Sequence, residues 1–341
     1  MLTELIWSLA CITHPSNPMN QDLKKYFFIT IWVLSLLFFS LDIALKFADE
    51  WMSIAANYIY IFSLIYLFVD SNFLTEKVNK TEKFVQLNGY DVSGVMVMII
   101  FATAFSLYLG FKSSLIFIVA IASLVISTWI LIKYRKLITR PLIIRALVIG
   151  SISSLFQHNF LPSFLVILVL TPMLFISASL LNAKFPVTTV NINDGAYSKL
   201  IKSFGIGCLF GLPIALSNLA NVITTNAYKW IDEFWKPILS FNAVLLEETI
   251  MRLFIITFIY ALLISKTEKR IIPITTAVLT SSVFFGFSHF PHVDIDNCFN
   301  IVFLYGIPLG VLLYKRDFET VVGYHFATNF LGAISSYLTN S

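Results

Sequence analysis

Residues 160–181, FLPSFLVILVLTPMLFISASLL, decide the fold of this chain, because they run without a single charged side chain. A membrane-spanning helix needs about 20 mainly apolar residues. The same character holds along the chain, in which 58% of the 341 residues are hydrophobic and 12% are charged. A soluble domain carries about 25% charged residues, and its helices keep a polar face. The sequence therefore predicts an all-α, polytopic transmembrane helical bundle.

Eleven segments are apolar enough to be predicted as membrane spans. They are residues 26–46, 51–70, 93–111, 113–132, 142–157, 160–181, 201–217, 237–262, 271–290, 299–314 and 319–338. With the N-terminus inside, the Lys and Arg clusters of the connecting loops fall on the cytoplasmic side, as the positive-inside rule requires. These clusters include Lys24 and Lys25; Lys133, Arg135, Lys136 and Arg140; Lys184, Lys199 and Lys202; and Lys315 and Arg316. We therefore expect about 11 spans with the N-terminus inside.

Charge and cysteine content exclude several other classes of protein. The net charge of +4 comes from short clusters rather than from a basic domain, so no nucleic-acid partner is predicted. The three cysteines have no CxxC spacing, and therefore suggest neither a disulfide framework nor a thiolate metal site. The partners to expect are the lipid bilayer and a membrane-associated substrate.

Ionisable residues within the predicted spans gather in the last third of the chain. The stretch LLEETIMRLF, residues 245–254, holds Glu247, Glu248 and Arg252, and two further spans carry His289 and His325. A charge within the bilayer is costly, so an intramembrane ionisable residue is by default a functional hypothesis. These residues are therefore the candidate site. The alternative is that the carboxylates are buried, are neutralised by Arg252 and have no catalytic role.

Helical spacing assigns different roles to the two glutamates. Glu248 and Arg252 are four residues apart on one helix face, with the glutamate first, which favours an ion pair. Glu247 lies about 100° around the helix and has no partner there. A carboxylate without a partner, held away from bulk water, is a good candidate for a general base acting on water.

The two histidines and Asn329 complete the predicted site. His325 and Asn329 are also four residues apart, so they present two donors from one face, which suits the oxyanion of a tetrahedral intermediate. The hypothesis is that Glu247 and His289 hold and deprotonate a water. This water would attack a peptide carbonyl that His325 and Asn329 polarise.

Three ordered motifs resemble those of the CAAX protease and bacteriocin-processing (CPBP) family, which includes the type II CAAX prenyl endopeptidases. They are Glu247-Glu248-xxx-Arg252, Phe285-xxx-His289 and His325-xxx-Asn329, and Gly306-Ile-Pro-Leu-Gly310 precedes the third. The resemblance covers about residues 200–338. It implies a catalytic Glu247, a water-holding His289, an oxyanion site at His325 and Asn329, and supporting roles for Glu248, Arg252 and Phe285.

The resemblance also implies an organisation and an activity. Residues 196–341 would be the CPBP-like catalytic core, and residues 1–195 would be N-terminal transmembrane helices of unassigned role. The expected activity is intramembrane, glutamate-dependent cleavage of a peptide bond in a membrane-associated or lipidated peptide. The expected location is a bacterial cytoplasmic membrane, in which the protein is integral and multi-pass.

Three alternatives stay open at this point. The first is a non-proteolytic scaffold or bacteriocin self-immunity protein of the same family. The second is a proton-coupled transporter, which is disfavoured because the two halves show no matching broken helices. The third concerns a cofactor: no HExxH run occurs and no metal is firmly predicted, but Glu247, His289 and His325 would be the ligands of a divalent ion such as zinc.

Helix lengths pose a geometric problem for His289. At 1.5 Å per residue, Glu247 and His325 lie about 15 Å along their helices from Lys236 and Lys315, near the middle of a bilayer. His289 lies roughly 28 Å from Arg270, which would place it near the far surface. The sequence predicts either a strongly tilted helix over 271–290 or a segment after Pro291 that dips into the protein.

Overall fold

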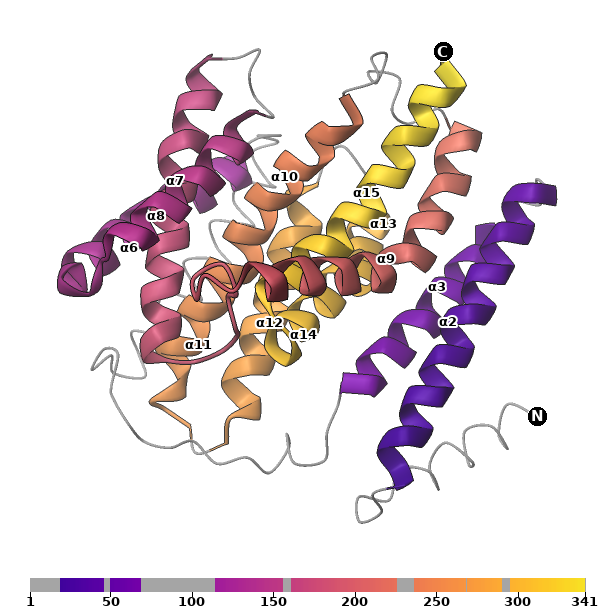
Figure 1. Ribbon diagram of the computed structural model, residues 1–341, viewed down its shortest axis with the longest axis horizontal. Helices are drawn as coiled ribbons and strands as arrows, with labels where there is room; N and C mark the ends of the chain where they lie inside the picture. The colour runs from indigo at the N-terminus through magenta and orange to yellow at the C-terminus, as the bar shows by residue number, and fades with distance from the viewer. Residues whose placement is uncertain are drawn as a thin grey trace.

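The computed structural model describes residues 19–45, 50–68, 114–155, 161–225, 236–267, 269–289 and 295–340. Within these ranges the regular elements are all helices. The loop over residues 185–196 joins two of them and forms one isolated bridge, between Thr189 and Asp317. The predicted all-α fold is therefore confirmed. Figure 1 shows the helices gathered around a central group, with α2 and α3 along one side and α6, α7 and α8 on the other.

The helices follow the predicted apolar segments. In the first part of the chain they are α2 (Met19–Leu45), α3 (Glu50–Phe68), α6 (Ser114–Lys133), the 3₁₀ turn η1 (Arg135–Leu137), α7 (Arg140–Ser154) and α8 (Leu161–Lys184). In the second part they are α9 (Tyr197–Thr225), η3 (Lys236–Ile238), α10 (Leu239–Glu247), η4 (Glu248–Ile256), α11 (Thr257–Ile264), α12 (Ile271–Ser288), α13 (Ile295–Ile301), η5 (Val302–Gly306), α14 (Ile307–Lys315) and α15 (Phe318–Asn340). The predicted span 93–111 lies outside the described residues.

Five of the described segments are long and apolar enough to cross a membrane. They are Asp22–Leu41, Phe164–Lys184, Tyr197–Leu219, Ile271–Ser288 and Ile295–Lys315. Shorter apolar segments run over Ile54–Phe68 and Ala122–Lys133. The count of eleven spans and the orientation of the N-terminus stay predictions.

Polarity is distributed as in a protein surrounded by lipid. Along α2, Leu34, Leu37 and Leu41 expose 55%, 56% and 58% of their surface. Glu248 and Arg252, in contrast, are completely buried. Water would favour the opposite arrangement, since exposed apolar surface and buried charge are both costly there.

The most extensive helix pair joins α9 to α15, the helix that carries His325. The two backbones approach closely because glycines lie at the crossing: a Cβ added to Gly211 would lie 2.6 Å from the carbonyl oxygen of Tyr324. Gly207, one turn earlier on α9, faces Thr320 in the same way. This is the GxxxG packing mode of membrane helices. Figure 1 shows α9 changing direction along its length, as expected of a helix with an internal proline, here Pro213.

Two buried acids fix the start of α15. Asp317 caps the helix by accepting hydrogen bonds from the backbone N–H and the hydroxyl of Thr320, at 2.8 and 2.7 Å. Glu319 accepts from the backbone N–H groups of Asn191 and Ile192, at 3.1 and 2.9 Å. The segment between α8 and α9 is thereby tied to α15, about two turns before His325. These contacts fix the position of the helix that carries the third motif, His325 and Asn329.

Candidate active site

The two glutamates lie where the first motif helix changes its winding. Glu247 is the last residue of α10, and Glu248 opens the π-helical segment η4, which continues into α11. The π-helix is rare, and short stretches of it inside α-helices are frequent at functional sites. The side chain of Glu247 is 36% exposed, whereas that of Glu248 is fully buried. One carboxylate is thus accessible, and its neighbour is enclosed.

Glu248 binds two partners. One carboxylate oxygen lies 2.6 Å from Nδ1 of His325, and the other lies 3.6 Å from Nε of Arg252. The ion pair predicted from the four-residue spacing is therefore present. The contact with His325 was not predicted, since it joins residues 77 positions apart. A carboxylate held by Arg252 accepts a hydrogen bond, so the Nδ1 proton of His325 points to Glu248.

The other side of the His325 ring faces Glu247 and Asn329. Nε2 of His325 lies 3.8 Å from a carboxylate oxygen of Glu247 and 3.2 Å from the side-chain nitrogen of Asn329. Since Glu248 engages Nδ1, Nε2 is the atom available for chemistry. The structure therefore brings together Glu247, Glu248, His325 and Asn329 around one imidazole, from two helical segments far apart in the sequence.

Phe285 of α12 joins the remaining site residues through its ring. The guanidinium carbon of Arg252 lies 4.0 Å from the ring centroid, which is a cation–π contact. The rings of His325 and His289 meet Phe285 edge to face, with centroids 5.6 and 4.9 Å away. Phe285 thus contacts Arg252 and both imidazoles, so the second motif meets the first and the third at this ring.

His289 lies beside this cluster but does not contact the glutamates. It caps the end of α12, where its Nδ1 lies 2.8 Å from the carbonyl oxygen of Phe285. Among the described side chains, it forms no ion pair with Glu247 or Glu248. The shared ring contacts nevertheless place the end of α12 next to His325, so His289 does not lie at a remote surface. That Glu247 and His289 hold one water stays a prediction.

A second glycine-lined contact holds α12 in place. A Cβ added to Gly286 would lie 2.6 Å from the carbonyl oxygen of Cys298, and one added to Gly306 would lie 2.7 Å from Cβ of Ser282. Gly310 likewise packs against Val278. The glycines that precede the third motif therefore let η5 and α14 press against α12, which carries Phe285.

The carboxylates and imidazoles of the site are side chains that could in principle hold a metal ion. In the part of the chain that the structure describes, no group of three or more His, Cys, Asp or Glu side chains is arranged to hold one. Nδ1 of His289 is engaged by its own helix, and Nδ1 of His325 is engaged by Glu248. In metal-binding histidines one ring nitrogen is commonly held in this way while the other binds the ion, so Nε2 would be the metal-binding atom of each ring. Glu247, His289 and His325 are not grouped as a metal cluster among the described residues, and the mechanism below uses no metal.

Fold and site together define a class: an all-helical integral membrane protein with a buried carboxylate, imidazole and guanidinium cluster between its helices. Residues 230–331 match the family model described as type II CAAX prenyl endopeptidase Rce1-like. This segment contains all seven predicted site residues, and the match confirms the resemblance drawn from the three motifs. The matched segment is 102 of the 341 residues, and the family it matches is one of CAAX proteases. No curated protein and no solved structure matches it.

Proposed function

We propose that this protein is an intramembrane, glutamate-dependent endopeptidase that uses an activated water to cleave a membrane-associated or lipidated peptide. The bacterial members that the motifs resemble favour a bacterial cytoplasmic membrane as its location. The observation that carries the proposal is the imidazole of His325, bound by buried Glu248 on one nitrogen and facing Glu247 and Asn329 with the other.

The proposed reaction uses Glu247 as the general base. A water beside its carboxylate transfers a proton to Glu247 and adds its oxygen to the carbonyl carbon of the peptide bond. The negative charge that forms on the carbonyl oxygen is stabilised by the Asn329 amide and by His325, whose Nε2 carries a proton in this step. When the carbon–nitrogen bond breaks, Glu247 returns its proton to the leaving amine.

Buried Glu248 and Arg252 support this chemistry without touching the substrate. Glu248 holds the His325 ring in one orientation, with Nε2 directed to the reaction. Before proton transfer, the two glutamates balance the charges of Arg252 and of His325 with both ring nitrogens protonated. After Glu247 takes the proton, the oxyanion carries the second negative charge, so the site stays neutral. His289 completes the proposed water site on the side of Phe285, which its ring already contacts.

An apolar hollow next to the motif helices supports a lipidated substrate. It has a volume of about 190 Å³ and lies between α3, α12 and α14, with Tyr314 and Lys315 at one side. Its lining includes Val278 and Leu279, and Phe285 follows Val278 by two turns on the same helix. We propose that the lipid chain of a substrate occupies this hollow while the peptide reaches Glu247.

The test is cleavage by the purified full chain in detergent, with a panel of prenylated and leader-bearing peptides. Glu247→Gln keeps the size of the side chain and removes the base, so turnover should fall at least about 1,000-fold while the fold is retained. The matched control, Asp296→Asn, removes an exposed carboxylate outside the site and should leave turnover unchanged. Full activity of Glu247→Gln would refute the mechanism, and peptide binding without cleavage by the native chain would indicate a scaffold or immunity protein instead. A chelator arm tests metal dependence.

A further inference from the structure

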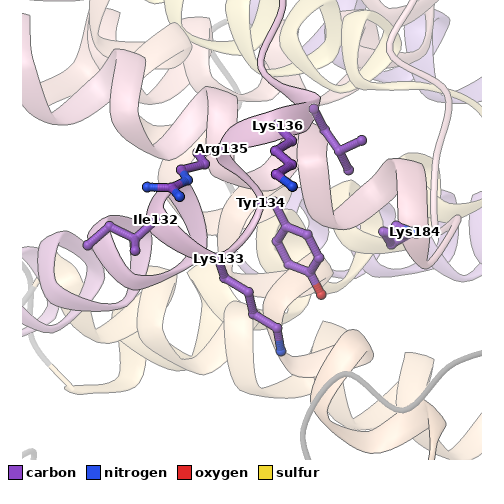
Figure 2. A pocket seen from close by; sticks show the side chains of 7 residues that line it. Ile132, Lys133, Tyr134, Arg135, Lys136 and Lys184 are labelled. Carbon is purple, nitrogen blue, oxygen red and sulfur yellow. The ribbon is translucent and has the colours of Figure 1, made fainter.

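A basic hollow lies away from the candidate active site, where the α6–α7 turn meets the end of α8. It has a volume of about 580 Å³, and its seven lining residues are Ile132, Lys133, Tyr134, Arg135, Lys136, Leu137 and Lys184. Four of them are cations and none is acidic. Figure 2 shows these side chains around the hollow, with Lys184 approaching from a different helix than the others.

The local backbone makes this hollow a defined shape. Between α6 and α7 the chain forms the short 3₁₀ turn η1, closed by hydrogen bonds such as the one from the N–H of Leu137 to Tyr134 O, at 2.9 Å. Thr139 then caps α7, with Pro141 in its first turn. Both α6 and α7 pack against α8, which carries Lys184 in its last turn.

Aromatic side chains hold one of the cations in place. Nζ of Lys133 lies 4.9 Å from the ring centroid of Trp129 and 5.5 Å from that of Tyr134. Trp and Tyr are enriched at the boundary between lipid tails and water, and basic residues next to apolar helices attract anionic headgroups. The hollow therefore has the composition of a headgroup site at the membrane surface.

An exposed apolar stripe leads from the hollow along α6. Val125, Trp129 and Ile132 are spaced by four and three residues, so they share one face of the helix. They expose 63%, 42% and 65% of their surface. A free phosphate would use only the cationic end of this surface, whereas a phospholipid would use the cations and the stripe together.

We propose that this hollow binds the phosphate-bearing headgroup of an anionic phospholipid, whose acyl chain lies along the exposed face of α6. The site belongs to the helices before the family match and is independent of the proposed peptidase activity. It gives part of the N-terminal region a role, which is recognition of the surrounding membrane.

The experiment measures lipid retained by the full chain after purification, by native mass spectrometry. Phosphatidylglycerol is compared with phosphatidylcholine of the same acyl chains, with and without excess inorganic phosphate. The test variant is Arg135→Gln/Lys136→Gln, in which both residues are exposed. The matched control, Lys199→Gln/Lys202→Gln, removes two exposed positive charges on the predicted cytoplasmic side, outside the hollow.

The expected result is preferential retention of phosphatidylglycerol that free phosphate does not displace. The Arg135→Gln/Lys136→Gln variant should lose affinity by roughly tenfold, and the control by about twofold or less. Equal losses of lipid affinity in the two variants would mean that general surface charge, and not this hollow, binds the lipid. That result would overturn the proposed site. Equal retention of the two lipids, or displacement by inorganic phosphate, would also overturn the proposal.

Discussion

Replacing Glu248 by Gln tests the most heavily buried contact of the candidate site. The substitution preserves shape but removes the charge between Arg252 and His325. Arg252 is fully buried, and its guanidinium nitrogens have no hydrogen-bond partner among the described residues. Removing one partner of a buried ion pair costs about 3–5 kcal/mol. We expect the lower end, about 3 kcal/mol, because the nearest nitrogen and oxygen of the pair lie 3.6 Å apart, beyond a short hydrogen bond.

The same substitution should reduce turnover for a different reason. The amide of Gln can either accept from Nδ1 of His325 or donate to it, so the ring is no longer held with its Nδ1 proton toward residue 248. Where a carboxylate orients a catalytic imidazole, its loss lowers kcat by up to about 10⁴-fold. We expect a decrease of roughly 100-fold or more in peptide cleavage.

Stability can be followed in detergent by thermal unfolding with a thiol-reactive dye, because Cys298 is completely buried in the folded chain. The double variant Glu248→Gln/Arg252→Met removes both charges. It should recover most of the lost stability, since replacing a whole buried ion pair is often neutral. It should not recover turnover, because His325 still lacks its carboxylate. Unchanged stability of the single variant, or restored turnover in the double variant, would refute this reasoning.

Three further predictions follow from the packing around the site. Gly211→Val should destabilise the protein by about 2 kcal/mol and lower turnover, because the new side chain meets the α15 backbone next to His325. The control Gly205→Val lies at an open position and should be tolerated in the same thermal assay. Asp317→Ala should lower stability by about 1 kcal/mol through loss of the α15 cap, and unchanged unfolding would contradict that role. Leu279→Trp should fill the apolar hollow and raise KM for a prenylated peptide, but not KM for the same peptide without its lipid. An equal change in KM for the two peptides would argue against lipid binding in the hollow.

Several features were predictable from the sequence because they depend on local or compositional signals. Long apolar runs predicted the helices, since a bilayer accepts only segments that satisfy their own backbone hydrogen bonds. The four-residue spacing predicted the pair of Glu248 and Arg252, and the order of the motifs predicted the family. Clustering of ionisable residues in otherwise apolar spans selected the candidate side chains, because a charge within the bilayer is costly. Of these, the structure places Glu247 and Glu248 at the ring of His325.

Tertiary structure alone decided how these residues meet. The hydrogen bond from His325 to Glu248 joins two helices, and no periodicity within either helix could indicate it. The π-helical winding that begins at Glu248 has no sequence signature. The contacts of Phe285 with Arg252 and both histidines depend on how α12 packs against η4 and brings this ring to His325 of α15. The sequence by itself determined which side chains share a helix face, as Glu248 and Arg252 do. Relative helix position decided that Glu248 is buried while Glu247 is 36% exposed, and which atom of His325 is free to react.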